Sequence, residues 1–367
     1  MAKTFMKNSD TLVIDLENEY KVLSTAGCPK IYKDVRYIVF RRVPKDFEYV
    51  DLDGYCKNIA KSIGIDYEKT TIFLTAVDVR SYGHATHMFR DVVAEAYVTF
   101  GVDKPSCIEA SNSSKTIGVG TINIAVIVNK PLDEVGLLDL YRLVSEVKGL
   151  VMGLAGPMCL TSPSIGTASD ATMVAAAWGN ERFSGIATDV GLSAAIATLK
   201  ALSKFLVGTN CIKYFVNSIG LQSLDEILEM ALKAYSKAPI PMLSSSEVEK
   251  ILRREFEDVF KDPNICMVVR GARLVEMLMA LNLFPGISEE EYRADTPKII
   301  ADELIGKAIA EYINGFKGLL AYYWIERLKE EGILVKLGSL PPMTDDIVAA
   351  VIGGILSRVY DRYLHSH

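Results

Sequence analysis

The spacing of apolar residues changes near residues 208–220, and this change constrains the fold more than any other feature of the sequence. Before it, short β-branched runs alternate with segments of helical period, whereas almost every segment after Ser223 repeats its apolar residues at helical spacing. A chain of 367 residues is long enough for two domains. We therefore predict an α+β domain over residues 1–210, with helices packed on a mixed sheet, followed by an all-α domain over residues 211–367.

Five segments of the first domain carry the clearest secondary-structure signals. Short β-branched runs predict strands at residues 71–77, 93–99 and 122–128. Apolar residues at helical spacing predict helices over Leu132–Leu154 and Asp189–Leu206. Connections rich in glycine and hydroxyl residues separate these segments, so polar side chains gather near strand ends and tight turns.

Composition and charge exclude several kinds of protein. Half of the residues are apolar, the net charge is −6, and no basic cluster is dense enough to bind nucleic acid. The opening segment, MAKTFMKNSD, lacks the apolar core of a signal peptide. The longest apolar stretches, Ile122–Val128 and Ile347–Leu356, fall short of the ~20 residues that span a membrane. We expect a cytoplasmic protein with no nucleic-acid partner and no membrane span, and a homo-oligomer is compatible with the sequence.

The cysteines are scattered along the chain, and none belongs to a C-x-x-C pair. They are Cys28, Cys56, Cys107, Cys159, Cys211 and Cys266. This spacing argues against a zinc ribbon and against the disulfide framework of a small secreted domain. We expect reduced, mostly buried thiols.

Carboxylates share helix faces with apolar residues in the second domain. On the helix predicted over Ile299–Ile313, Asp302 lies on one stripe with Ile305 and Ile309, and Glu303 lies beside it. A buried carboxylate is costly unless it is paired or binds a metal. If Asp302 faces inward, its carboxylate therefore needs a paired group or a bound metal.

The last helix repeats this arrangement. Asp345 shares a stripe with Val348, and Asp346 shares one with Ala350. Two carboxylate pairs on inward faces suit Mg²⁺, which prefers oxygen ligands and could neutralise a phosphoester and activate water. The predicted Mg²⁺ ligands are Asp302, Glu303, Asp345 and Asp346, with Lys307 and Lys317 as candidate phosphate contacts. Helix capping is the alternative, above all for Asp345, which follows Thr344.

Three stretches of the second domain carry a family resemblance: RGARLVEMLMALNLFPGI, ADELIGKAIAEYINGFKGLLAYYWIERLKEEGIL and LPPMTDDIVAAVIGGILSRVYDRYL. From roughly Ser223 to the C-terminus, the chain resembles the archaeal α-ribazole-phosphate phosphatase family, which is related to the phosphatidylglycerophosphatase A group. The most specific elements of that family are D-E-x-x-G and D-D-x-x-x-G. They match here at Asp302, Glu303, Gly306, Asp345 and Asp346. Ala350 stands where a glycine often follows.

This resemblance implies a helical fold and metal-dependent hydrolysis of a phosphomonoester. The implied substrate is α-ribazole 5′-phosphate, which would give α-ribazole. The alternative is a lipid phosphatase that acts on phosphatidylglycerophosphate. The absence of a spanning segment in the sequence weighs against that alternative.

The first domain contains no G-x-S-x-G nucleophile motif, and its candidate site consists of polar residues at strand ends and turns. The predicted catalytic residues are Asp78, His84, His87, Thr121, Asn123, Thr167 and Asp170. Glycines in the segment GVGT, before the third predicted strand, would let a ligand approach the backbone. Glu146 and Lys148 lie on the first predicted helix, in SEVKGL.

Each of these residues also has an alternative interpretation. His84 and His87 are three positions apart, so on a helix they could share a metal, although the other histidines belong to the C-terminal tail. They could equally transfer protons or form a surface pair. Asp170 could cap a turn by binding backbone amides, and Asn123 could be an inward structural amide.

A second resemblance covers the first domain. The segments LTAVDV, VTFGVDKP, GTINIAVIVNKPL, SEVKGLVMGLAG and SIGTASDATMVAAA occur in this order. From about Tyr20 to Leu206, the chain resembles the adenosylcobinamide amidohydrolase family. The G-T-I-N-I strand and a later G-T-x-x-D turn are its best marks, although this chain has GTASD where a second glycine and threonine are common.

This second resemblance implies cleavage of the amide that joins the corrinoid side chain to aminopropanol, which yields adenosylcobyric acid. Together, the two resemblances point to an archaeal bifunctional family of cobinamide salvage. We expect Asp170, His84 or His87 to act in acid–base catalysis, and Asn123 with the amides of GVGT and GTAS to stabilise an oxyanion or hold the corrinoid amides. No cofactor is implied with certainty for this domain, and a corrinoid-binding module without activity is the alternative.

Overall fold

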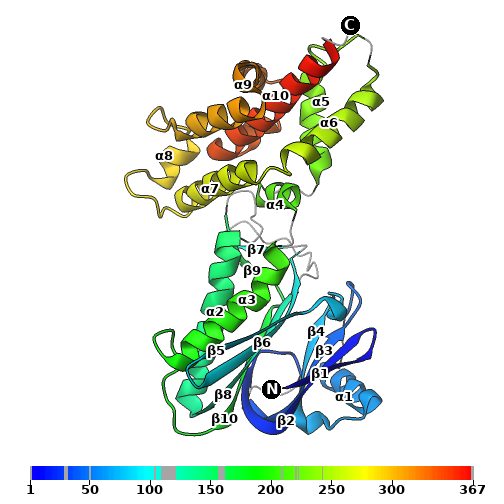
Figure 1. The fold of residues 1–367 in the computed structure, drawn as a ribbon, viewed down its shortest axis with the longest axis vertical. Helices are drawn as coiled ribbons and strands as arrows, with labels where there is room; N and C mark the ends of the chain where they lie inside the picture. The colour runs from blue at the N-terminus through cyan, green and yellow to red at the C-terminus, as the bar shows by residue number, and fades with distance from the viewer. Residues whose placement is uncertain are drawn as a thin grey trace. The chain divides into compact units, whose positions relative to one another are not determined.

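The computed structural model divides into two compact units, and Figure 1 labels the elements of each. The first unit contains Met1–Gly156 and Ser164–Gly208, and the second contains Pro157–Pro163 and Thr209–His367. The structure describes residues 2–28, 32–48, 51–102, 105–108, 121–155, 162–207, 210–219, 221, 223–241 and 243–364. Of the helices in these ranges, none combines the length and the apolar character needed to cross a bilayer.

The first unit is built on a large mixed sheet. Its elements are β1 (Lys3–Asn8), β2 (Thr11–Ser24), β3 (Tyr32–Arg42), α1 (Leu52–Ile63), β4 (Thr70–Thr75), β5 (Gly83–Phe89), β6 (Val92–Gly101), β7 (Ser106–Cys107), β8 (Thr121–Leu132), α2 (Glu134–Ala155), β9 (Ser164–Gly166), β10 (Ala171–Trp178) and α3 (Asp189–Val207). Within the described residues, the sheet has the order β4-β3-β2-β10-β8-β6-β5, with β1 paired to β2. The pairs β3–β4 and β8–β10 are parallel, and the other pairs of this sheet are antiparallel.

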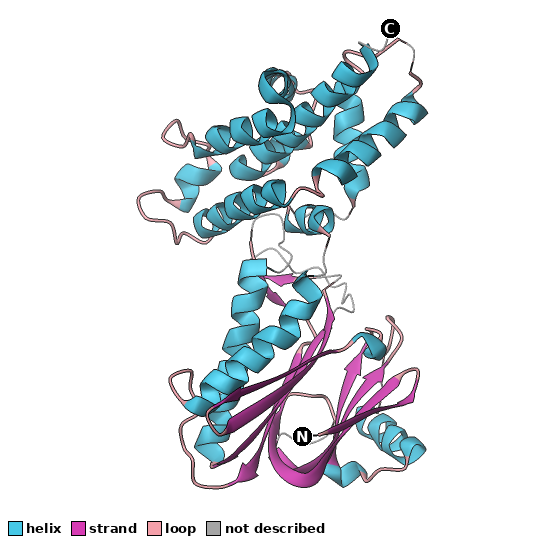
Figure 2. Cartoon of the chain, viewed as in Figure 1, coloured by secondary structure: helices cyan, strands magenta, loops and turns pink. Residues whose placement is uncertain are grey.

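Side chains on the two sides of this sheet meet different neighbours because they alternate along each strand. Ile124 and Val126 of β8 pack with the apolar sides of α2 and α3, which run together along this side of the sheet (Figure 2). Ala125 and Ile127 point the other way and join Tyr97 in a separate core. We call this second side the inner face.

The sheet curls so that distant strands approach each other across the inner face. Three strands separate β4 from β8 in the sheet order, yet the side-chain amide of Asn123 on β8 donates a hydrogen bond to the carbonyl of Leu74 on β4 at 3.2 Å. Val77, just past β4, lies against Gly101 at the end of β6, where an added Cβ would come within 2.5 Å of its side chain. The accumulated twist of the strands thus brings the end of β4, the end of β6 and the start of β8 together.

The second unit is helical throughout its described part. Its helices are α4 (Cys211–Ser218), α5 (Leu224–Tyr235), α6 (Ser245–Val259), α7 (Pro263–Ala280), α8 (Glu289–Arg293), α9 (Ala301–Glu330) and α10 (Pro342–Leu364). Ser244 and Ser288 start α6 and α8 with capping boxes, in which a glutamate three positions on completes the hydrogen bonds. Helix α10 is buried along most of its length and forms the centre of this unit.

Helix α9 reverses direction in its middle. Backbone angles at residues 314–315 are not helical, and Gly315 has φ 59, a conformation that favours glycine. An added Cβ on Gly318 would lie 2.1 Å from the carbonyl oxygen of Ala310, and one on Gly306 would lie 3.0 Å from the ring of Tyr322. These contacts are impossible in a straight helix, so the two halves of α9 fold against each other.

The predicted fold class is confirmed: a mixed sheet with packed helices comes first, and helices follow. The predicted strands appear as β4, β6 and β8, and the two predicted helices as α2 and α3. The sequence analysis missed β2, because the first part of this strand is buried on both sides and shows no alternation.

The expectation of reduced cysteines is wrong for the five cysteines that the structure describes, while Cys159 lies outside the described residues. Disulfides join Cys28 to Cys56 and Cys211 to Cys266, with Cα atoms 6.2 and 5.9 Å apart, and Cys107 is also disulfide-bonded. The bonded partners are 28 and 55 residues apart in the sequence. Such pairs depend on how separate elements pack, so motif spacing could not reveal them.

Candidate functional site

Five polar side chains gather where β8 and β10 begin. They are Thr121, Asn123, Lys148, Thr167 and Asp170, which we call the strand-end cluster. Because β8 and β10 are parallel and Ala171 pairs with Asn123, the residue just before β10 lies beside the start of β8. The carboxylate of Asp170 therefore accepts a hydrogen bond from the backbone of Ile122 at 2.8 Å.

Asp170 has a full set of partners. Besides Ile122, its carboxylate accepts hydrogen bonds from the backbone amide of Thr167 at 3.0 Å and from the Thr167 hydroxyl at 2.5 Å. The ammonium of Lys148, on α2, lies 2.8 Å away and forms an ion pair with it. The Asp170 side chain is 9% exposed and that of Lys148 is 18% exposed, so the ammonium is the more accessible group. Asp170 thus anchors both the turn and the lysine.

Gly166 leaves the space that this ion pair occupies. An added Cβ at residue 166 would lie 2.0 Å from a carboxylate oxygen of Asp170 and 3.1 Å from the ammonium of Lys148. The glycine in the GTASD segment is therefore required by the close approach of a charged pair. Any larger residue would displace the carboxylate.

Thr121 and Asn123 are almost fully buried, each 1% exposed. The Thr121 hydroxyl lies 3.0 Å from the carbonyl of Ser169 and 3.2 Å from the Asn123 side-chain oxygen. Thr99 pairs with Asn123 across the sheet, and its buried hydroxyl has no hydrogen-bond partner among the described residues. The sequence analysis missed Thr99. Residues 118–120 of the GVGT segment lie outside the described residues.

Asp78 does not hydrogen-bond to the strand-end cluster. It caps a short 3₁₀ helix (Val79–Ser81) and accepts hydrogen bonds from the backbone amide and the guanidinium of Arg80. The hydrogen bonds from Arg80 lower the pKa of Asp78 to about 2. Its carboxylate is thus ionised and already engaged near neutral pH.

The two histidines lie on opposite sides of β5, because side chains three positions apart on a strand alternate. The interpretation that His84 and His87 share a metal on a helix is therefore wrong, because they lie on a strand. No described group of three or more His, Cys, Asp or Glu residues is arranged to hold a metal ion. His84 lies on the inner face, where its ring stacks on Tyr97 with centroids 4.4 Å apart.

In the second unit, carboxylates gather around the start of α10. We call them the acidic cluster: Asp295, Asp302, Glu303, Glu326, Asp345 and Asp346. The ammonium of Lys329 lies 2.9 Å from Asp345 and 2.5 Å from Glu326, while the Tyr322 hydroxyl donates to Asp346 at 2.9 Å. The reversal of α9 explains this assembly, since it brings Glu326 and Lys329 back towards the first turn of the same helix.

The members of the acidic cluster oppose one another's ionisation. Burial raises the pKa of Asp345 to about 8, against the opposing effect of Lys329. Burial, followed by the charge of Glu326, raises the pKa of Asp346 to about 7. Partial desolvation and the neighbouring Asp302 also raise the pKa of Glu303, although most of this residue is exposed. The cluster therefore has a deficit of positive charge near neutral pH.

A buried polar network fixes the first turn of α10. The guanidinium of Arg273 contacts both Glu276 and the hydroxyl of Thr344, and Thr344 also donates to Glu276. The Tyr292 hydroxyl donates to Glu276 at 2.9 Å and accepts from the backbone of Met343 at 3.1 Å. Thr344 precedes Asp345, so this network sets the position of the acidic cluster.

Of the two lysines proposed as phosphate contacts, Lys317 lies away from the acidic cluster, whereas Lys307 is close enough for its charge to act on Glu303. Lys317 pairs with Asp361, which is sixteen positions beyond Asp345 on α10, or about 24 Å along the helix. The interpretation of Lys317 as a contact for a phosphate at the acidic cluster is therefore wrong. The ammonium of Lys307 lies 5.7 Å from the ring centroid of Tyr323. Lys329 is the cation that the sequence analysis missed.

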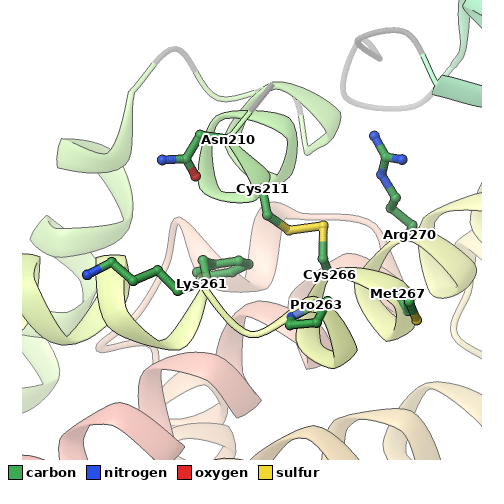
Figure 3. A pocket seen from close by; sticks show the side chains of 8 residues that line it. Asn210, Cys211, Lys261, Pro263, Cys266, Met267 and Arg270 are labelled. Carbon is green, nitrogen blue, oxygen red and sulfur yellow. A yellow bond between two sulfur atoms is a disulfide. The ribbon is translucent and has the colours of Figure 1, made fainter. Parts of the chain in front are cut away.

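Two cavities in the second unit lie away from the acidic cluster. One, of about 510 Å³, is lined by the Cys211–Cys266 disulfide and by Lys261 and Arg270 (Figure 3). The other, of about 530 Å³, is lined mainly by apolar side chains, including Trp324. Neither contains a residue predicted to bind metal.

Comparison with known proteins identifies the first unit. Residues 1–210 match the family model described as CbiZ, adenosylcobinamide amidohydrolase. No curated protein matched the chain. Among solved structures, the chain is similar to the l-aminopeptidase d-ala-esterase/amidase from Ochrobactrum anthropi, described as a new variant among the Ntn hydrolase fold. That match has 10% identity and a TM-score of 0.26 and covers 55% of this chain and 82% of the other, which is too distant to support an argument about function.

Proposed function

Because the chain belongs to the adenosylcobinamide amidohydrolase family, we propose that its first unit hydrolyses the amide between the corrinoid side chain and aminopropanol in adenosylcobinamide. The products would be adenosylcobyric acid and aminopropanol. The family match over residues 1–210 is the observation that carries this proposal.

The strand-end cluster supplies groups that suit a substrate with amide side chains. An amide carbonyl oxygen accepts hydrogen bonds, most strongly from a charged donor. The ammonium of Lys148 is partly exposed and is held in place by Asp170, so it is suited to hold such an oxygen. Asp170, with four donors around its carboxylate, would act as the positioning residue for Lys148 rather than as a general base.

Direct assay of the full chain tests this proposal. We expect incubation with adenosylcobinamide to release aminopropanol and adenosylcobyric acid in equal amounts, measured by liquid chromatography and mass spectrometry. A spectral shift of the corrinoid without release of aminopropanol would instead support a binding module. Absence of both release and binding would contradict the proposal.

For the second unit, we propose a Mg²⁺-dependent phosphomonoesterase that acts on α-ribazole 5′-phosphate. The acidic cluster supports this proposal, because its carboxylate oxygens are the ligands that Mg²⁺ prefers and its raised pKa values indicate a need for positive charge. The described carboxylates are not arranged as a metal site in this structure, so Asp345, Asp346 and Asp302 would have to turn towards a common point to hold the ion, with Glu303 at the exposed side. When bound, Mg²⁺ would polarise the phosphate and activate a water molecule.

The neighbours of the acidic cluster would then change partners. In the present arrangement, Lys329 holds Asp345, and Tyr322 holds Asp346. An ion on Asp345 would release the ammonium of Lys329 from that carboxylate, so that Lys329 could keep Glu326 and donate to a phosphate oxygen, while Tyr322 would keep Asp346 in orientation.

Substrate comparison tests the second proposal. We expect phosphate release from α-ribazole 5′-phosphate with Mg²⁺ and none after EDTA treatment. Faster release from phosphatidylglycerophosphate in detergent would favour the lipid phosphatase. Full activity in EDTA would contradict the metal-dependent mechanism.

A further inference from the structure

A charged residue stands in the interior of β6 without any role in the strand-end cluster. Glu95 is 7% exposed and points to the inner face, between two buried alanines of the strand, Ala94 and Ala96. An apolar residue would fill this position without the cost of burying a charge. Something other than packing therefore accounts for a carboxylate here.

Three groups converge on this carboxylate. The backbone amide of Ala2 donates to Glu95 at 3.2 Å, and the hydroxyl of Tyr97 donates at 2.9 Å. Ala2 donates to Oε1 of Glu95, whereas Tyr97 donates to Oε2. Nε2 of His84, on the neighbouring strand, lies 3.7 Å from the same Oε2. Burial opposes ionisation of Glu95, but the nearby imidazole of His84 and the hydrogen bond from Tyr97 outweigh it and lower the pKa of Glu95.

The imidazole of His84 is held but remains accessible. Its ring stacks on Tyr97 with an interplanar angle of 21°, and its side chain is 39% exposed. Because Nε2 points towards Glu95, Nδ1 is the nitrogen available to a ligand. A buried carboxylate behind a partly exposed imidazole is the arrangement that orients a histidine for proton transfer.

The position of His84 relative to the strand-end cluster suits a large substrate. His84 pairs with Tyr97, and Tyr97 lies two positions from Thr99, which pairs with Asn123. His84 is therefore about 7 Å along the strands and about 10 Å across them from Asn123, on the same face. One amide cannot lie at both places, so in a large corrinoid the scissile amide would bind beside His84 while the strand-end cluster holds another of its side chains.

We propose that His84 transfers the proton in amide hydrolysis and that Glu95 and Tyr97 are positioning residues for its imidazole. This inference rests on the proposed amidohydrolase function. In the first step, a water molecule gives a proton to Nδ1 of His84, its oxygen bonds to the amide carbon, and the carbonyl electron pair moves to oxygen. In the second step, the carbonyl re-forms, the C–N bond breaks with its electron pair on nitrogen, and His84 gives the proton to that nitrogen.

The test measures aminopropanol release by the full chain and its variants. We expect His84→Gln to lower kcat about 10²- to 10⁴-fold, the usual contribution of general acid–base catalysis. Added imidazole should partly restore activity to His84→Ala, which a purely structural role would not allow. Glu95→Gln and Tyr97→Phe should lower kcat by a smaller factor with little change in KM. Met88→Gln, an exposed position on the same strand, is the matched control.

Circular dichroism and thermal unfolding would establish that each variant folds. An active wild type with His84→Gln within threefold of it would overturn the inference and leave the proposed function standing. A wild type that releases no aminopropanol would overturn both. An inactive His84→Ala that imidazole does not restore would reduce His84 to a structural residue and also overturn the inference.

Discussion

Buried carboxylates occur in both units, but their surroundings differ. Asp170 in the first unit accepts hydrogen bonds from two backbone amides, a hydroxyl and an ammonium. Asp345 and Asp346 in the second unit share one lysine and one tyrosine with several other carboxylates. Burial alone therefore does not decide what a carboxylate does, because donors around it favour the ion whereas like charges favour the protonated acid or a bound cation.

The largest effect on stability and activity is expected when the carboxylate of Asp170 is removed. Asp170→Ala would leave the ammonium of Lys148 without its counter-ion and several donors without an acceptor. Loss of one member of a buried ion pair costs about 3–5 kcal/mol, so we expect a decrease of this size in the free energy of unfolding and loss of aminopropanol release. Urea unfolding would measure it. Asp91→Ala, at an exposed carboxylate, is the control, and an equal effect there would contradict the assigned role.

Addition of Mg²⁺ distinguishes the second unit from the first. If the acidic cluster binds the ion, the folded state gains about 2.7 kcal/mol at a concentration one hundred times Kd. We expect a higher melting temperature of the wild type and a smaller increase for Asp345→Asn. Isothermal titration calorimetry checks the same binding without any activity assay. An equal increase in both proteins would place the ion elsewhere.

A methyl group added at residue 166 should disturb the ion pair of Asp170 and Lys148 in the first unit. Gly166→Ala places a Cβ 2.0 Å from the Asp170 carboxylate and separates it from Lys148. Overpacking of this kind costs about 2 kcal/mol. Gly149→Ala is the matched control, since nothing lies within 4 Å of its added Cβ and the position is helical. Urea unfolding should show a loss of stability for the first variant and none for the second.

The smallest expected effect is an increase in the free energy of unfolding, and it concerns Asp346 in the acidic cluster. The pKa of Asp346 is about 7 in the folded protein and about 3.9 in an unfolded chain, so the folded state binds more protons between these values. The free energy of unfolding therefore falls as the pH rises from about 4 to 7. Asp346→Asn should remove this loss and stabilise the metal-free protein by about 1 kcal/mol at pH 8. If Asp346→Asn raised the free energy of unfolding no more at pH 8 than at pH 5, that result would contradict the raised pKa.

The chain sequence predicted parts of the candidate site that depend on short-range patterns. Thr167 and Asp170 were expected at a strand end or turn, and β10 begins at Ala171. Asp302 was expected on an inward stripe, and it is buried. Glu95 had a visible signal, a charged residue inside an apolar strand segment, but the predicted catalytic residues did not include it.

Other partners could not be predicted, because they come from distant segments. Lys148 meets Asp170 only after α2 packs against the sheet, and Glu326 and Lys329 meet Asp345 only after α9 reverses. The spacing of residues along one helix carries no information about such a reversal. The pairing of Cys211 with Cys266 is hidden for the same reason.

The amino-acid sequence by itself determined the two fold classes and the family of the first unit, because residue periodicity and family motifs are local properties of the chain. The tertiary structure decided which polar groups are partners and in what charge state. It showed that Asp170 is an anchor, that His84 and His87 lie on opposite faces, and that Lys329 stands among the carboxylates. The physical reason is that a charge depends on the groups within a few ångströms of it, and the fold selects those groups from the whole chain.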